Sequence, residues 1–202
     1  MSLVNPLRVG PTVLVTGVGD AEGSRGAAAA LACAGADVDV ATLMVDVGGR
    51  APRPTLLASA AARGLEERLV AHLPQVRAAA RGQVCHLAVP ADAEGLSAAA
   101  SAVTVAREEP AVVHLPPALL QAAVSGRDGL RPRGVLLRAD LAADRALVAL
   151  AARDLIARGL TVCVLKQRLN WVSERRALFG VLPPGSPGLP ERLIRRLVGA
   201  AA

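Results

Sequence analysis

The residues with the clearest chemical potential follow the first apolar run of the chain. They are three glycines of a short segment and the two residues after the last of them: Gly17, Gly19, Gly23, Ser24 and Arg25. A strand, a glycine-rich turn and a helix in this order direct main-chain N–H groups and the positive end of the helix toward one point. Such a point can hold an anion, so these residues are candidates for contact with nucleotide phosphates. For the three glycines we favour a tight strand-to-helix turn over nucleotide contact, because glycine takes positive φ values without strain.

A phosphate loop of Walker type that supports catalysis has a lysine and then a serine or threonine after its last glycine. The lysine reaches the terminal phosphates, and the hydroxyl holds magnesium. With Gly23 as that last glycine, Ser24 takes the lysine position and Arg25 takes the serine or threonine position. Both functional groups are therefore missing. Arg25 can contact phosphate, but its planar guanidinium does not replace the compact charge of lysine.

These residues need strands and helices to position them. Short β-branched or aliphatic runs alternate with longer Ala/Leu/Arg stretches of helical period, which predicts a mostly parallel sheet covered by helices. The expected strands are 12–16, 41–47, 83–89, 111–115, 134–138 and 160–166, with helices in the intervals. We predict a single three-layer α/β domain over 1–182. A Pro/Gly-rich connection and a C-terminal amphipathic helix follow in 183–202.

The helix expected over 140–158 is the best marked. Asp140 is its candidate N-cap, Asp144 lies in the first turn, Arg158 lies in the last turn, and Gly159 is placed for the C-cap. Its apolar residues recur with helical period, so we expect them to face the sheet: Leu141, Leu147, Val148, Leu155 and Ile156.

Two strand ends extend the pattern beyond the first loop. Residues 43–49 (LMVDVGG) resemble the strand end hhhVDxD of the MinD/ParA family of deviant-Walker ATPases, which includes ATPase-like members found with Tad-type pilus and secretion machinery. Asp46 is kept, and Gly48 stands at the second acid. Residues 112–117 (VVHLPP) resemble the family's hhhDxPP segment, with His114 in place of the acid that supports magnesium.

A late segment completes this resemblance. Residues 160–166 are similar to the family strand that is followed by an asparagine in contact with adenine, and the resemblance gives this role to Asn170. Asp46 and Asn170 therefore join the loop residues as candidates for nucleotide contact. The resemblance covers most of the chain in pattern, and it implies a P-loop NTPase-like or Rossmann-like fold.

The resemblance implies a degenerate member of the family, because the lysine, the serine or threonine and the magnesium-supporting acid are all replaced. We expect a pseudo-ATPase with no catalytic residue, no metal and no resident cofactor, ATP or ADP being the alternative cofactor. Its expected role is that of an interaction or positioning component of a pilus or secretion assembly. Two alternatives stay open: an ATPase with an unorthodox phosphate loop, and a dinucleotide-binding Rossmann protein, since residues 16–38 resemble the start of short-chain dehydrogenases.

Composition limits the function further. Hydrophobic residues make up 52% of the 202 residues and charged residues 20%, so the chain has enough apolar side chains to form a core. Aromatic residues make up 1% and tyrosine is absent, which excludes base-stacking surfaces and the tyrosine-dependent chemistry of short-chain dehydrogenases.

Cys33, Cys85 and Cys163 lie far apart, and we expect buried thiols in a reducing cytoplasm. The histidine spacings match no metal site.

The end of the chain combines apolar and basic residues. In 189–198, Leu189, Leu193 and Leu197 fall on one side of a helical wheel. We expect this helix to pack on its own domain or on a second subunit. The resemblance to MinD implies a further possibility, in which the helix lies on the inner face of the membrane. Basic residues nearby offer an alternative DNA-binding role, which interspersed glutamates disfavour: Arg175, Arg176, Arg192, Arg195 and Arg196. The expected protein is cytoplasmic, with a protein partner or a homodimer rather than nucleic acid.

Overall fold

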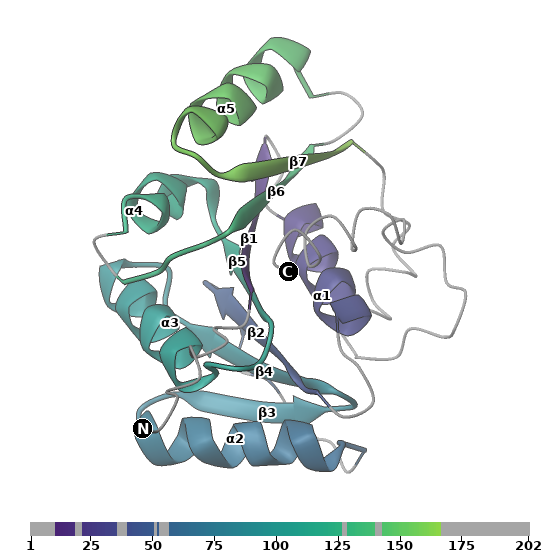
Figure 1. Cartoon of the computed structure of the whole chain (residues 1–202), viewed down its shortest axis with the longest axis vertical. Coiled ribbons are helices and arrows are strands. Elements are labelled where there is room, and N and C mark those ends of the chain that lie inside the picture. Colours follow the sequence, from purple (N-terminus) through teal and green to yellow (C-terminus); the bar gives the residue numbers. More distant parts are fainter. Residues whose placement is uncertain are drawn as a thin grey trace, which may run out of the picture.

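The structure, a computed structural model, describes residues 11–18, 22–35, 40–50, 52, 57–126, 129–139 and 143–166. In this part of the chain, helices cover both faces of a mostly parallel sheet (Figure 1). The predicted α/β class with helix, sheet and helix layers is therefore confirmed. The predicted boundary at 182/183 lies outside the described residues.

The strands of the described residues are β1 (Thr12–Val18), β2 (Thr42–Val47), β3 (Arg77–Arg81), β4 (Val84–Val89), β5 (Ala111–Leu115), β6 (Gly134–Ala139) and β7 (Thr161–Lys166). The helices are α1 (Glu22–Gly35), α2 (Ala60–His72), α3 (Ala93–Val105), α4 (Leu120–Val124), which follows a 3₁₀ turn (Pro117–Leu119), and α5 (Arg145–Ala157). None of the described helices is both long and apolar enough to cross a membrane.

The strand order brings four strand ends to one place. The described sheet has the order β3-β4-β2-β5-β1-β6-β7, and only β3 runs antiparallel to its neighbour. The first strand, β1, lies between β5 and β6, and β2 lies between β5 and β4. The carboxyl ends of β1, β2, β5 and β6 therefore share one edge with the start of α1. In open parallel sheets this edge, where the strand order changes direction, is the usual place for a ligand.

The core has two parts because strand side chains alternate between the faces. Val13 and Val15 pack with α1 on one face, whereas Leu14 packs on the other face with residues of α2, α3, α4 and α5. Residues 27–32 of α1 are at most 7% exposed, and five of the six are alanine. Their small side chains let this helix approach the sheet closely.

Six predicted strands are confirmed, with ends that differ by at most two residues, but β3 was not predicted. Its sequence, RAAAR, has no β-branched residue, and alanine by itself favours a helix. The strand forms because it pairs antiparallel with β4. Glu66 of α2 also accepts a hydrogen bond from Ala80 N–H at 3.1 Å. Tertiary pairing thus overrides the local preference.

The predictions for α5 are partly wrong. The N-cap is Asp144, whose side chain accepts a hydrogen bond from Ala146 N–H at 2.8 Å; Asp140 and Leu141 lie outside the described residues. Gly159 follows the helix with φ +80°, as predicted for a C-terminal glycine. Val148 and Leu155 are buried, but Leu147 and Ile156 are each 58% exposed and do not face the sheet. The stripe of buried residues on α5 is therefore narrower than its stripe of apolar residues, because exposed leucine and isoleucine side chains lie beside the buried ones.

Gly95, in the first turn of α3, has no room for a side chain. A Cβ there would lie 1.9 Å from the carbonyl oxygen of Pro90, which is backbone and cannot rotate away. Alanine is favoured over glycine in a helix by about 1 kcal/mol. We expect the collision to outweigh this gain, so that Gly95→Ala lowers the free energy of unfolding by about 2 kcal/mol in urea titrations.

The matched control for this substitution is Gly64→Ala in α2. Nothing lies within 4 Å of a Cβ added at Gly64. This variant is expected to raise the free energy of unfolding by up to about 1 kcal/mol, because only the helix preference acts. A Gly95→Ala protein as stable as the Gly64→Ala protein is incompatible with the tight contact at Pro90.

Candidate functional site

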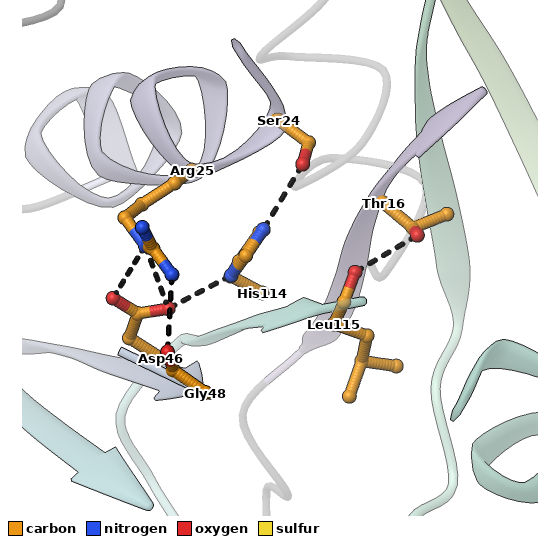
Figure 2. Close-up of polar contacts among 7 residues, drawn as sticks. All are labelled: Thr16, Ser24, Arg25, Asp46, Gly48, His114 and Leu115. Atoms are coloured by element: carbon orange, nitrogen blue, oxygen red, sulfur yellow. Dashed lines mark hydrogen bonds and ion pairs between the residues drawn. The ribbon is translucent and has the colours of Figure 1, made fainter. Parts of the chain in front are cut away.

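The candidate site lies at the carboxyl edge of the sheet, between the first turn of α1 and the ends of β2 and β5 (Figure 2). Ser24 and Arg25 come from α1, Asp46 comes from β2, and His114 comes from β5. The register of the two strands places Asp46 directly opposite His114. The topology thus brings together polar residues from three separate segments of the chain.

Ser24, His114 and Asp46 form a continuous hydrogen-bonded relay. The Ser24 Oγ atom lies 3.0 Å from Nε2 of His114, and Nδ1 of the same imidazole lies 2.8 Å from Oδ1 of Asp46 (Figure 2). The exposed fractions are 0% for Ser24 and 2% for each of the other two residues. Buried polar groups are costly unless they are hydrogen-bonded, so this relay stabilises the fold where α1 meets β2 and β5.

Arg25 adds a positive charge at the end of the relay. Its Nε lies 2.8 Å from Oδ2 and 3.1 Å from Oδ1 of Asp46, and its Nη2 donates to the carbonyl oxygen of Gly48 at 3.3 Å. Burial alone raises the pKa of Asp46. The hydrogen bond from His114 and the charge of Arg25 outweigh burial and hold this pKa below its usual range. The carboxylate is therefore ionised at neutral pH and has two partners.

The turn after β2 closes around this carboxylate. Gly48 has φ +80°, a conformation that side-chain-bearing residues rarely adopt. A Cβ on Gly49 would lie 2.0 Å from Oδ2 of Asp46. Gly49 is therefore required by the packing of Asp46, whereas Gly48 is required by its positive φ.

Gly23 is also explained by a close approach rather than by a turn. It lies inside α1, and a Cβ there would lie 2.2 Å from Cζ of Arg138. Arg138 is 3% exposed and comes from β6, where it is in register with Gly17 of β1. The expectation that Gly17 and Gly23 take positive φ values is wrong, because Gly17 belongs to a strand and neither is among the described glycines with positive φ.

Four of the candidate residues lie together at this site: Gly23, Ser24, Arg25 and Asp46. Gly19 and Asn170 lie outside the described residues, as do Leu189, Leu193 and Leu197. His114, which stands in place of an acid in the family pattern, is buried and uses both ring nitrogens in hydrogen bonds. Arg138 was not a candidate, although an arginine inside the apolar segment 134–139 is a signal that could have identified it.

The other titratable groups of the described residues include two partly buried cysteines, one buried cysteine and His86. Among the described residues, no group of three or more His, Cys, Asp or Glu side chains is arranged to hold a metal ion. Cys85 is buried as predicted, and burial raises the pKa of its thiol to about 12. Cys33 and Cys163 are only partly buried, in contrast to the prediction. Burial lowers the pKa of His86, so its imidazole is neutral at physiological pH.

The chemistry of this site has to be inferred from its own geometry. No protein-family model and no curated protein matches this chain. What the described residues provide is a buried carboxylate with a cationic partner, an imidazole bonded at both nitrogens, and a serine hydroxyl at the start of a helix. These groups can share and move protons among themselves.

Proposed function

We propose that this protein is a pseudo-ATPase of MinD/ParA type that acts without nucleotide hydrolysis, as an interaction or positioning component of a pilus or secretion assembly. One observation carries the proposal: the side chains at the phosphate and metal positions of such a site contact one another. Ser24, at the lysine position, bonds to His114, at the position of the magnesium-supporting acid. Catalysis of phosphoryl transfer depends on positioned cations around the phosphates. Because Ser24 and His114 bond to each other, they are suited to keeping the site closed to a nucleotide.

The charges support the same proposal. In an active site of this type, a buried carboxylate is compensated by magnesium. Here Arg25 lies 2.8 Å from Asp46 and supplies a cation from the protein itself. The carboxylate needs no divalent ion to be stable in its buried position, because the guanidinium and the imidazole already satisfy it. The site is therefore compatible with a folded state that needs neither metal nor nucleotide.

The partner in this proposal is another protein, or a second copy of the chain, rather than nucleic acid. Since the groups that hold a nucleotide are replaced, we infer that any assembly forms independently of ATP. A cytoplasmic location, with peripheral membrane contact through Leu189, Leu193 and Leu197, belongs to the same proposal.

An ATP hydrolysis assay tests the proposed function. We expect the full chain to release no more phosphate from ATP with magnesium than the background without protein, because the lysine and the metal-supporting acid are absent. The assay is run in parallel on Asp46→Ala. Magnesium-dependent hydrolysis that disappears in this variant overturns the proposal in favour of an ATPase with an unorthodox loop. Saturable binding of NAD instead favours the dinucleotide-binding alternative.

A further inference from the structure

The relay uses the two nitrogens of His114 in a particular order. The serine hydroxyl lies on Nε2 and the carboxylate on Nδ1, at 3.0 Å and 2.8 Å. An ionised carboxylate at Nδ1 keeps the imidazole proton on that nitrogen, so the Nε2 lone pair faces the hydroxyl proton of Ser24. The hydroxyl, the imidazole and the carboxylate are therefore linked in the same spatial order as the nucleophile, the base and the orienting carboxylate of acyl-transfer enzymes on unrelated folds.

The position of Ser24 favours the same chemistry. Ser24 lies in the first turn of α1, at the positive end of a fourteen-residue helix. Negative charge that develops next to the Ser24 Oγ atom during an attack is stabilised by this end of the helix. All three side chains are at most 3% exposed, so the field of the helix and the charge of Asp46 act in a medium of low polarity and are weakly screened.

We propose that Ser24 is a nucleophile for acyl transfer, with His114 as its general base and Asp46 as the residue that positions the imidazole. The substrate class is a carboxylic ester with a small acyl group. The Ser24 Oγ atom attacks the carbonyl carbon, its proton passes to Nε2 of His114, and the ester C–O bond breaks as that proton moves to the departing alcohol. Water then attacks the acyl-serine with His114 as base, which releases the carboxylic acid and restores the hydroxyl.

This inference goes beyond the proposed function and does not depend on it, because acyl transfer needs neither nucleotide nor metal. Ser24 is 0% exposed in the described state, so a reagent reaches it only when the site opens. We therefore expect a slow reaction, over hours, and a preference for small electrophiles.

The test uses a small alkyl fluorophosphonate on the full chain, with intact-mass spectrometry and peptide mapping. Attack by Ser24 breaks the P–F bond, fluoride leaves, and a phosphonyl group stays on the Oγ atom. We expect one adduct per chain, on Ser24, absent from Ser24→Ala. His114→Gln keeps hydrogen-bonding capacity but provides no base, and we expect it to slow labelling by at least about 100-fold. We expect Asp46→Asn to slow labelling at least as much.

The matched control is Thr16→Val. Thr16 is another buried hydroxyl nearby, and it donates to the carbonyl oxygen of Leu115 at 2.9 Å rather than to an imidazole (Figure 2). This variant is expected to be labelled at the wild-type rate. The wild-type peptide map decides even where a relay variant fails to fold: no adduct, or an adduct on any other residue, overturns the proposal. Equal labelling rates in wild type and a folded His114→Gln protein overturn it as well.

Discussion

Asp46→Ala is expected to lower the free energy of unfolding by about 3 kcal/mol, at the low end of what removal of one partner from a buried ion pair costs. The variant leaves His114 without its acceptor at Nδ1 and Arg25 without its carboxylate. Arg25 is one-third exposed and can turn toward water, so most of the loss arises at the buried imidazole. For a chain of this size the thermal midpoint falls by about 2–4 °C per kcal/mol, which calorimetry resolves.

The control for this variant is Asp154→Ala on α5. Asp154 also pairs with an arginine, Arg158, at 3.3 Å, but both side chains are more than 40% exposed. Water and salt screen such a pair, so the midpoint should change little. A shift for Asp46→Ala as small as that for Asp154→Ala means that the buried relay does not hold α1 to the sheet.

The relay also predicts a pH dependence. Since His114 and Arg25 hold the pKa of Asp46 below its usual range in the folded state, folding favours the ionised carboxylate. This contribution is complete above the ordinary pKa of about 3.9 and is lost as the pH falls through the lower folded value. The stability difference between wild type and Asp46→Asn should therefore shrink below about pH 4. A difference that stays constant down to pH 2 contradicts an ionised, paired Asp46.

Leu14→Ala is expected to cost about 3 kcal/mol of unfolding free energy. Leu14 is fully buried on β1, between Val113 of β5 and Val135 of β6. Loss of its side chain leaves a cavity that neighbouring strands cannot close. Leu147→Ala on α5 is the control, because Leu147 is 58% exposed and we expect a change below about 0.5 kcal/mol. A large loss for Leu147→Ala in urea titrations indicates that this face of α5 is covered in solution.

The fold could be predicted where local preference and tertiary environment agree. The apolar runs that form β2 and β5 are rich in residues that favour strands, and a buried parallel strand needs such residues on both faces. The failure at β3 has the opposite cause, since alanine favours a helix and only pairing with β4 creates the strand. On α5, the period of the apolar residues identifies the helix, but it does not show which of those residues the sheet covers.

The site could be predicted only in part. Ser24, Arg25 and Asp46 were identifiable because they follow a glycine or end an apolar run. The link from Ser24 to Asp46 through His114 depends on β2 lying beside β5, and strand order is not visible in a single sequence. The glycines show the same limit: a Cβ at Gly23 or Gly49 would meet the buried side chain of Arg138 or Asp46, and neither contact is visible in the sequence.

Titration of ATP into the full chain tests our proposal that the protein's own side chains hold the nucleotide position closed. Calorimetry with and without magnesium is expected to give only the heat of dilution, because Arg25 and His114 already satisfy the groups that a nucleotide and its metal would contact. Saturable binding of one ATP per chain that requires magnesium and is lost in Arg25→Ala would overturn this proposal.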